Sequence, residues 1–256
     1  MTLQAAKITK SNVANQVTWA TTLDASDTTP KETRGVIRED FHPVFGPRKF
    51  KYVRFDVATT AGDLCSMRTP IDVPNITSGT TTSITTSGLT ADIYVGGILR
   101  CYDDAGAAGA APEGESGIIT KNTTTVITID SNDAFSAAAG ANDDFKVFLP
   151  WAVIAAASGD VNALVAGVAM ATQAQYSWGW VQFYGLHPAV RAVAAGTTIT
   201  AQKCVIAATS AVTVGSTSAA ELRVGFADIT LTTDTVLRTL PVRLFCGDAF
   251  PFGAST

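Results

Sequence analysis

Charged side chains are scarce in this sequence. Only 16% of the 256 residues are Asp, Glu, Lys or Arg, against roughly 25% in ordinary soluble proteins. The net charge is −4, and no run of Lys or Arg occurs. Binding to nucleic acid requires a basic face, so we expect no direct contact with DNA or RNA. A surface of low charge suits permanent protein contacts, although a β-rich composition alone would give the same statistic.

Groups that could carry out catalysis are also few. The two histidines, His42 and His187, each precede a proline, which favours extended backbone and predicts loop or strand-end positions. No nucleophile elbow, phosphate-binding loop or HExxH motif occurs. A calcium site at Asp103 and Asp104 with a nearby glutamate is an alternative that spacing alone does not support. We therefore expect a protein that is not an enzyme and holds no cofactor or metal.

The cysteines do not form a pattern. All four are far apart in the chain and no CxxC pair occurs, so neither a zinc site nor a disulfide framework is indicated. Each lies in a strand-like context, which predicts buried, reduced thiols in a protein made in a cytoplasm. These residues are Cys65, Cys101, Cys204 and Cys246.

No apolar run is long enough to cross a membrane. The longest, residues 147–171, is interrupted by Pro150 and by Gly159-Asp160, and it falls short of about 18 unbroken apolar residues. The first residues lack the apolar stretch of a secretory signal. We expect no membrane contact and no secretion.

Strand signals, in contrast, recur along the whole chain. Residues 48–57 and 119–129 alternate between apolar and polar side chains, as half-buried strands do. Small residues followed by Gly-Asp or Gly-Thr mark corners, which short-stranded barrels and sandwiches need. Helical spacing is weak, and residues 132–139 are the best candidate. We predict an all-β fold, a β-barrel or β-sandwich of short antiparallel strands with little helix.

The domain organisation follows from the same reading. Residues 1–34 are polar and irregular and form a predicted N-terminal arm. Trp19 favours an arm that folds on a partner, but it is equally compatible with an arm that packs back on its own chain. Residues 35–256 form a β-rich body, which allows two β subdomains with a boundary near residues 131–145.

Aromatic residues are concentrated in residues 175–190, QYSWGWVQFYGLHPAV. In a strand, Trp178, Trp180 and Tyr184 share one broad amphipathic face, while Val181 and Phe183 lie on the other. Tyr and Trp are enriched in protein interfaces, and three such rings suffice to anchor one. Three interpretations remain open: packing against a second sheet of the same chain, a contact with another subunit, or a platform for a sugar or small ligand.

The phrases NTTTVITID (122–130) and WGWVQ (178–182), within residues 35–253, resemble virion structural proteins of tailed bacteriophages. The resemblance is strongest to capsid decoration, or cement, proteins. It implies a homo-oligomer, most often a trimer, that binds the outer face of the major capsid protein shell and braces it. It also implies synthesis in the host bacterial cytoplasm and a final place on the capsid exterior.

This resemblance gives each aromatic candidate an expected role. We expect Trp178, Trp180 and Tyr184 to contact a neighbouring subunit, and Trp19, Phe41 and Phe45 to contact the shell. The alternatives are another virion component (a head fibre, a tail protein or the main capsid subunit) or a carbohydrate-binding β-sandwich.

Overall fold

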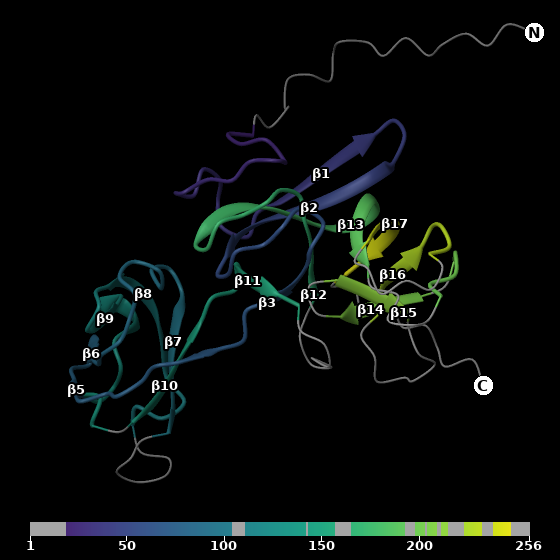
Figure 1. The fold of residues 1–256 in the computed structure, drawn as a ribbon. Coiled ribbons are helices and arrows are strands. Elements are labelled where there is room, and N and C mark those ends of the chain that lie inside the picture. Colours follow the sequence, from purple (N-terminus) through teal and green to yellow (C-terminus); the bar gives the residue numbers. More distant parts are fainter. Residues whose placement is uncertain are drawn as a thin grey trace, which may run out of the picture.

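The computed structural model is built almost entirely from β-strands, as the alternation predicts (Figure 1). It describes residues 19–103, 111–141, 143–156, 165–192, 198–202, 204–208, 211–214, 223–231 and 238–246. Within these ranges the helical structure is one short 3-10 turn, η2 (Ser131–Asp133), at the start of the stretch that the sequence offers as a helix. In the part of the chain described, no helix is both long and apolar enough to span a membrane.

The strands form two sheets, and the larger one contains ten strands. It is built from both halves of the chain: β1 (Ile37–His42), β2 (Gly46–Phe55), β3 (Leu64–Met67), β11 (Ala152–Ala155), β12 (Val165–Ala169), β13 (Ser177–Ala192), β14 (Cys204–Ala208), β15 (Ala211–Val214), β16 (Arg223–Ala227) and β17 (Arg238–Phe245).

The ten-stranded sheet closes on itself twice. Strand β13 pairs with both β12 and β2, which closes a ring through β11 and β3. It also pairs with both β15 and β17, which closes a second ring through β14 and β16. The predicted barrel is therefore realised as two small rings that share β13, and two of the pairings, β2–β11 and β13–β15, are parallel rather than antiparallel.

The length of β13, at 16 residues, makes this sharing possible. Its first half follows β2 from Ser177↔Phe55 to Tyr184↔Lys49, and its second half follows β17 from Tyr184 onward. At the changeover Gly185 has φ +89°, and a Cβ there would collide with the carbonyl oxygen of Pro47. Only glycine accepts this conformation and this close approach without strain, so the bend depends on that residue.

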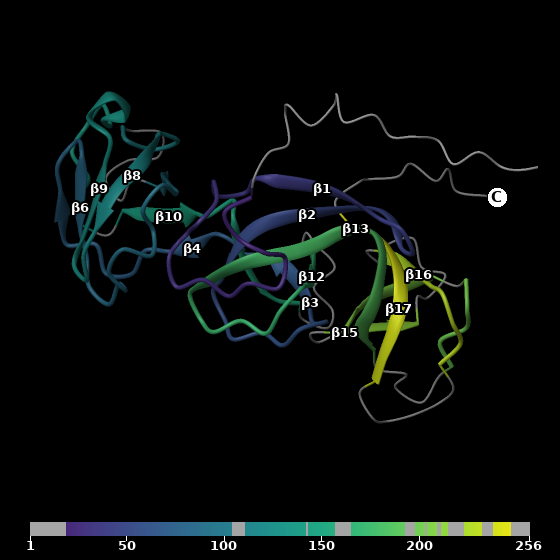
Figure 2. The same cartoon turned by 90° about the horizontal axis from the view of Figure 1, so that it is seen from above.

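The second sheet is an insertion between β3 and β11, and it lies to one side of the first in both views (Figures 1 and 2). Its strand order is β4-β10-β7-β8-β9-β6-β5. The possible boundary near residues 131–145 falls inside this sheet, because β10 pairs with β4 and β7. The strands are β4 (Ile71–Asp72), β5 (Ser78–Gly79), β6 (Ser83–Thr85), β7 (Ile98–Asp103), β8 (Ser116–Asn122), β9 (Val126–Ile129) and β10 (Asp144–Phe148).

Three groups of buried side chains hold these parts together. One group, with Val53 and Val181, fills the ring that contains β2 and β3. A second, with Val190 and Leu240, fills the ring that contains β17. The third is the largest and joins the inserted sheet to the outer side of β2 and β13, with Trp180 among its members. Burial of apolar surface is the main stabilising contribution of each.

The described part of the predicted N-terminal arm packs against its own chain. Residues 19–34 are irregular, as expected, but they lie along β13, where Asp27 forms an antiparallel bridge with Trp178. Gln173 donates a hydrogen bond to the carbonyl oxygen of Ala25, which fixes the same segment at a second point. Residues 1–18 lie outside the described residues, so the prediction of an arm that reaches a partner applies only to them.

Cys65, Cys101 and Cys246 are buried and none of the three is part of a disulfide, as the sequence predicts. Burial raises the pKa of the Cys65 and Cys246 thiols, with that of Cys246 at about 12. Thiols held in the neutral form are poor nucleophiles, so these cysteines are structural. The side chain of Cys204 lies outside the described residues.

Candidate interaction surface

Trp178 and Trp180 belong to the interior of the chain and are not available to a neighbouring subunit. Trp180 has no exposed surface and Trp178 has 5%. Residues 19–34 cover one part of their face and the inserted sheet borders the rest. The prediction of a subunit contact is therefore wrong for these two residues, because the segment that covers them comes from a distant part of the same chain.

The buried rings form a compact aromatic group with Tyr52 and Trp19. The ring centroids of Trp19 and Trp180 are 5.4 Å apart at 87°, and those of Tyr52 and Trp180 are 5.1 Å apart at 60°. Edge-to-face pairs of this kind are favourable beyond the area they bury. Trp19, which was predicted to contact the shell, is itself only partly exposed and packs on Trp180 of its own chain. We call Trp19, Tyr52, Trp178 and Trp180 the inner aromatic cluster.

The Tyr52 hydroxyl, at the rim of the inner aromatic cluster, is hydrogen-bonded to residues 19–34. The Tyr52 hydroxyl donates to Asp27 Oδ2 at 3.1 Å and accepts from the Lys31 backbone N–H at 3.2 Å. Burial raises the pKa of this hydroxyl, so it stays protonated and remains a donor. Arg34 lies over the rings of Trp151 and Trp178, at 5.2 and 5.5 Å from their centroids.

The other aromatic candidates lie at the far end of the same strands, around the β1–β2 hairpin. Phe41 is 73% exposed and Val44, in the turn, is 77% exposed. His42 Nδ1 accepts hydrogen bonds from the backbone N–H groups of Val44 and Phe45, and its ring stacks on Phe45 at 4.4 Å. The histidine therefore fixes the turn and holds apolar side chains at its end.

Arg48 anchors the hairpin to the body beneath it. Its guanidinium pairs with Asp40 at 3.0 Å and lies over the rings of Phe45 and Phe50. Below it His187 is buried within β13, where its Nδ1 accepts from the Ala189 N–H. Burial, with a smaller effect from the Arg48 charge, lowers the pKa of His187 to about 4. This imidazole is neutral at neutral pH, and its place inside a strand differs from the predicted strand end.

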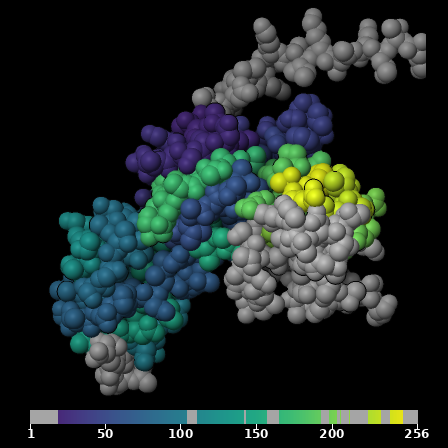
Figure 3. All heavy atoms as spheres, viewed as in Figure 1, coloured from purple at the N-terminus to yellow at the C-terminus, as the bar shows by residue number. Residues whose placement is uncertain are grey.

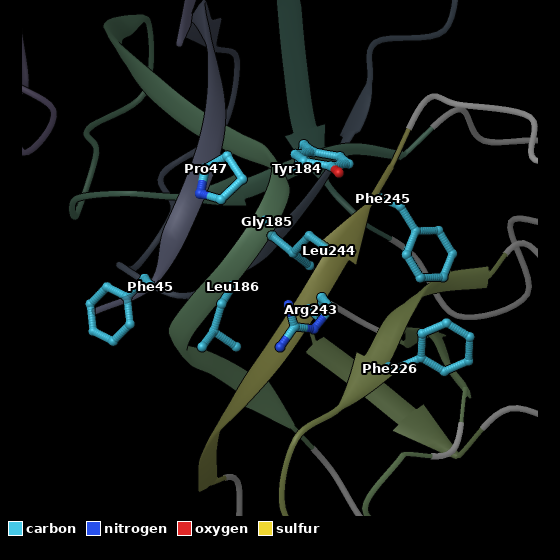
Figure 4. A pocket seen from close by; sticks show the side chains of 9 residues that line it. All are labelled: Phe45, Pro47, Tyr184, Gly185, Leu186, Phe226, Arg243, Leu244 and Phe245. Carbon is cyan, nitrogen blue, oxygen red and sulfur yellow. The ribbon is translucent and has the colours of Figure 1, made fainter. Parts of the chain in front are cut away.

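An apolar groove of about 220 Å³ adjoins the hairpin. Figure 4 shows the hairpin residues Phe45 and Pro47 on one side and Phe226 and Phe245 on the other. Its floor and walls come from neighbouring strands, since Tyr184 pairs with Phe245 in register and Arg243 pairs with both Leu186 and Phe226. The lining residues are Phe45, Pro47, Tyr184, Gly185, Leu186, Phe226, Arg243, Leu244 and Phe245.

The hairpin end and the groove form one surface. Phe41 lies opposite Pro47 in the β1–β2 register, and Pro47 lines the groove. Of the six aromatic candidates the structure thus brings Phe41, Phe45 and Tyr184 together here, and Trp19, Trp178 and Trp180 in the inner aromatic cluster. We call Phe41, Val44 and the groove lining the hairpin surface.

Sequence reasoning missed several members of the hairpin surface. Val44 lies next to Phe45 in a short turn. An apolar side chain at a hairpin turn is the sequence signal that could have identified it. Leu186, Phe226 and Phe245 come from three strands that are remote in sequence, so no local pattern connects them. Their assembly depends on the pairing of β13, β17 and β16.

A second exposed apolar region lies on the inserted sheet. Ile98 pairs with Ile118 on one side and with Phe148 on the other, so the three form a row across the sheet. Ile118 is 52% exposed. Beside this row Tyr102 lies near Arg100 and Lys146, at 5.5 and 5.1 Å from its ring centroid. This face is a plain sheet surface, whereas the hairpin surface adjoins a recess.

Among the described residues, no group of three or more His, Cys, Asp or Glu side chains is arranged to hold a metal ion. Comparison with protein-family models, with curated proteins and with solved structures finds no match to the chain.

Proposed function

We propose that the chain is a bacteriophage capsid decoration protein that attaches to the outer face of the shell through the hairpin surface. The observation that carries the proposal is the exposed apolar end of the hairpin, Phe41 and Val44, beside an apolar groove. Large apolar side chains that are exposed together mark interaction sites. The low charge of the whole chain reduces the cost of covering such a surface.

The mechanism is burial of apolar surface without turnover. Covering a Val or Phe side chain fully is worth roughly 1.5–3 kcal/mol. The groove adds a recess that can enclose a side chain of the major capsid protein. Many weak attachments on one particle raise the total strength of the coat, and they do so more strongly when the copies are linked to each other.

The fold supports a bracing role. Each ring of the ten-stranded sheet closes on itself, and β13 belongs to both. The inserted sheet packs against the outer side of β2 and β13, so the hairpin surface and the inserted sheet belong to one packed body. The proposal includes synthesis in the bacterial cytoplasm, a final position on the capsid exterior, and the major capsid protein and further copies of the chain as partners. Contact with nucleic acid or membrane forms no part of the proposal.

The experiment is quantitative mass spectrometry of phage particles, purified from a culture infected with the phage that encodes the chain. A shell coating predicts hundreds of copies per particle, in fixed ratio to the major capsid protein. A handful of copies would assign the chain to the tail or portal instead, and its absence from purified particles would contradict a virion role.

A further inference from the structure

The outer edge of β1 is an open template for another strand. Strand β1 is the end of the ten-stranded order and, among the described residues, it pairs only with β2. It has six residues without proline, and its register with β2 is continuous from Ile37 to His42. An edge of this kind presents unpaired backbone donors and acceptors.

The register identifies which backbone groups face outward. The Tyr52 N–H donates to the Val36 carbonyl oxygen, which makes that position a hydrogen-bonded pair with β2. In an antiparallel pair, hydrogen-bonded positions alternate with positions whose N–H and C=O point away. The backbone groups of Ile37, Glu39 and Phe41 therefore point away from β2, toward the open edge.

We propose that a second copy of this chain pairs with this edge, antiparallel, about a twofold axis through Glu39. In this register Ile37 of each copy lies opposite Phe41 of the other, and the two Glu39 residues lie opposite each other. All outward-facing groups then find partners, giving about six interchain hydrogen bonds from three hydrogen-bonded pairs. A register shifted by one residue would place inward-facing groups at the edge, so it is excluded.

In the same register, the side chains of β1 in one copy are complementary to those of β1 in the other copy. Ile37 and Phe41, at 52% and 73% exposure, become cross-strand neighbours and cover each other. Phe41 is then taken by the second copy, and Val44 and the groove of the hairpin surface are left for the shell. Arg38 of each copy comes opposite Asp40 of the other, so opposite charges face each other twice, while Asp40 also pairs with Arg48 of its own copy and Arg38 lies over the ring of Trp19. The sequence IREDF is therefore complementary to its own reverse, which favours a second copy over an unrelated strand.

The pair of Glu39 residues is unfavourable for this arrangement, and a contact within each copy reduces the repulsion between them. The two Glu39 side chains face each other across the axis, and like charges directly opposite are unfavourable. Each, however, is paired with Lys49 of its own copy at 2.9 Å. Charged residues on edge strands commonly prevent association, but here the central charge is neutralised within each copy.

The test uses Glu39→Pro in the full chain, with Glu39→Gln as its matched control. Proline removes the Glu39 N–H, which faces away from β2, so the β1–β2 hairpin is retained; glutamine removes the charge and keeps the N–H. In sedimentation velocity we expect the wild type to dimerise, Glu39→Pro to raise the dimer Kd at least tenfold, and Glu39→Gln to leave it equal or lower. Circular dichroism and urea unfolding establish that both variants are folded.

A second variant tests the register directly. Glu39→Cys places the new thiols on the axis, where facing Cα atoms of a hydrogen-bonded pair are about 5.5 Å apart, within reach of a disulfide. We expect a covalent dimer on mild oxidation, and none from Val44→Cys at the hairpin turn. A wild type that stays monomeric at millimolar concentration, or self-association that Glu39→Pro leaves unchanged, overturns the proposal. So does a Glu39→Pro variant that loses only its attachment to particles, because the edge would then serve the shell.

Discussion

Aromatic side chains gather at the two ends of the stretch over which β2 pairs with β13, and these two ends have opposite environments. At one end Tyr52, Trp178 and Trp180 are buried beneath residues 19–34. At the other end Phe45 and Tyr184 line an open groove beside the exposed hairpin turn. A register shift between Gln182 and Tyr184 interrupts the alternation between the two ends, so Tyr184 does not share the face of Trp178 and Trp180 as predicted. The two ends also differ in whether another part of the chain covers them.

Figure 3 makes the same contrast visible. Residues 19–34, in purple, lie over the described body near the inserted sheet, while the β1–β2 hairpin, in blue-violet, is beside them at the edge of the molecule. The aromatic side chains under the covering segment stabilise the fold. Those of the hairpin surface contribute less to the fold and are available to a partner.

The largest expected effect comes from the inner aromatic cluster. Replacing Trp180 by Ala removes a ring with no exposed surface, which should lower the free energy of unfolding by about 3–5 kcal/mol. The matched control is Tyr184→Ala, four residues along the same strand and partly exposed, for which we expect about 1 kcal/mol or less. Urea unfolding measures both losses when it is followed by circular dichroism, because that signal does not rely on tryptophan fluorescence. Equal losses in the free energy of unfolding would contradict the difference between the two ends.

The next effect is a pH dependence beneath the hairpin surface. The pKa of His187 is lowered to about 4 in the folded chain, against about 6.5 when unfolded. Between these values the unfolded chain binds more protons, so stability is constant above about pH 6.5 and falls as the pH decreases toward 4, by up to about 3 kcal/mol. Urea unfolding at pH 7.5 and pH 4.5 measures this loss.

The variant His187→Gln should flatten this part of the pH profile. Glutamine does not titrate, so the loss between the two pH values should shrink toward that of the remaining groups. A profile as steep as that of the wild type would show that His187 is protonated without cost in the folded chain, which burial beneath Arg48 does not allow.

Much of the fold could be predicted from the sequence because alternation is a local signal. The strand around residues 48–57 lies where the pattern placed it, as β2, whereas the single strand predicted at residues 119–129 is two antiparallel strands, β8 and β9, joined by a turn. The insertion of the second sheet was not predicted, because strand partners such as β4 and β10 are set by contacts between distant residues. The same reason explains the double closure through β13, whose 16 residues exceed the length of an ordinary strand.

The site could be predicted only in part. Alternation correctly placed Trp178 and Trp180 on one face, but it gives no information about what covers that face. The covering segment, residues 19–34, lacks any regular period, and it is held to Trp178 by two backbone hydrogen bonds and to Gln173 by one side-chain hydrogen bond. Phe41 and Val44 are exposed because β1 is an edge strand, which follows from the sheet order rather than from local sequence.

The most direct measurement compares two surface variants for binding to particles stripped of the chain. Val44→Glu places a charge at the centre of the hairpin surface, and Ile118→Glu makes the same change at an exposed residue of the inserted sheet. The free energy of unfolding of each variant should lie within about 0.5 kcal/mol of the wild-type value, because neither residue is buried. We expect Val44→Glu to lose at least tenfold in particle affinity and Ile118→Glu to bind like the wild type. Unchanged binding by Val44→Glu, or a greater loss with Ile118→Glu, would contradict attachment through the hairpin surface.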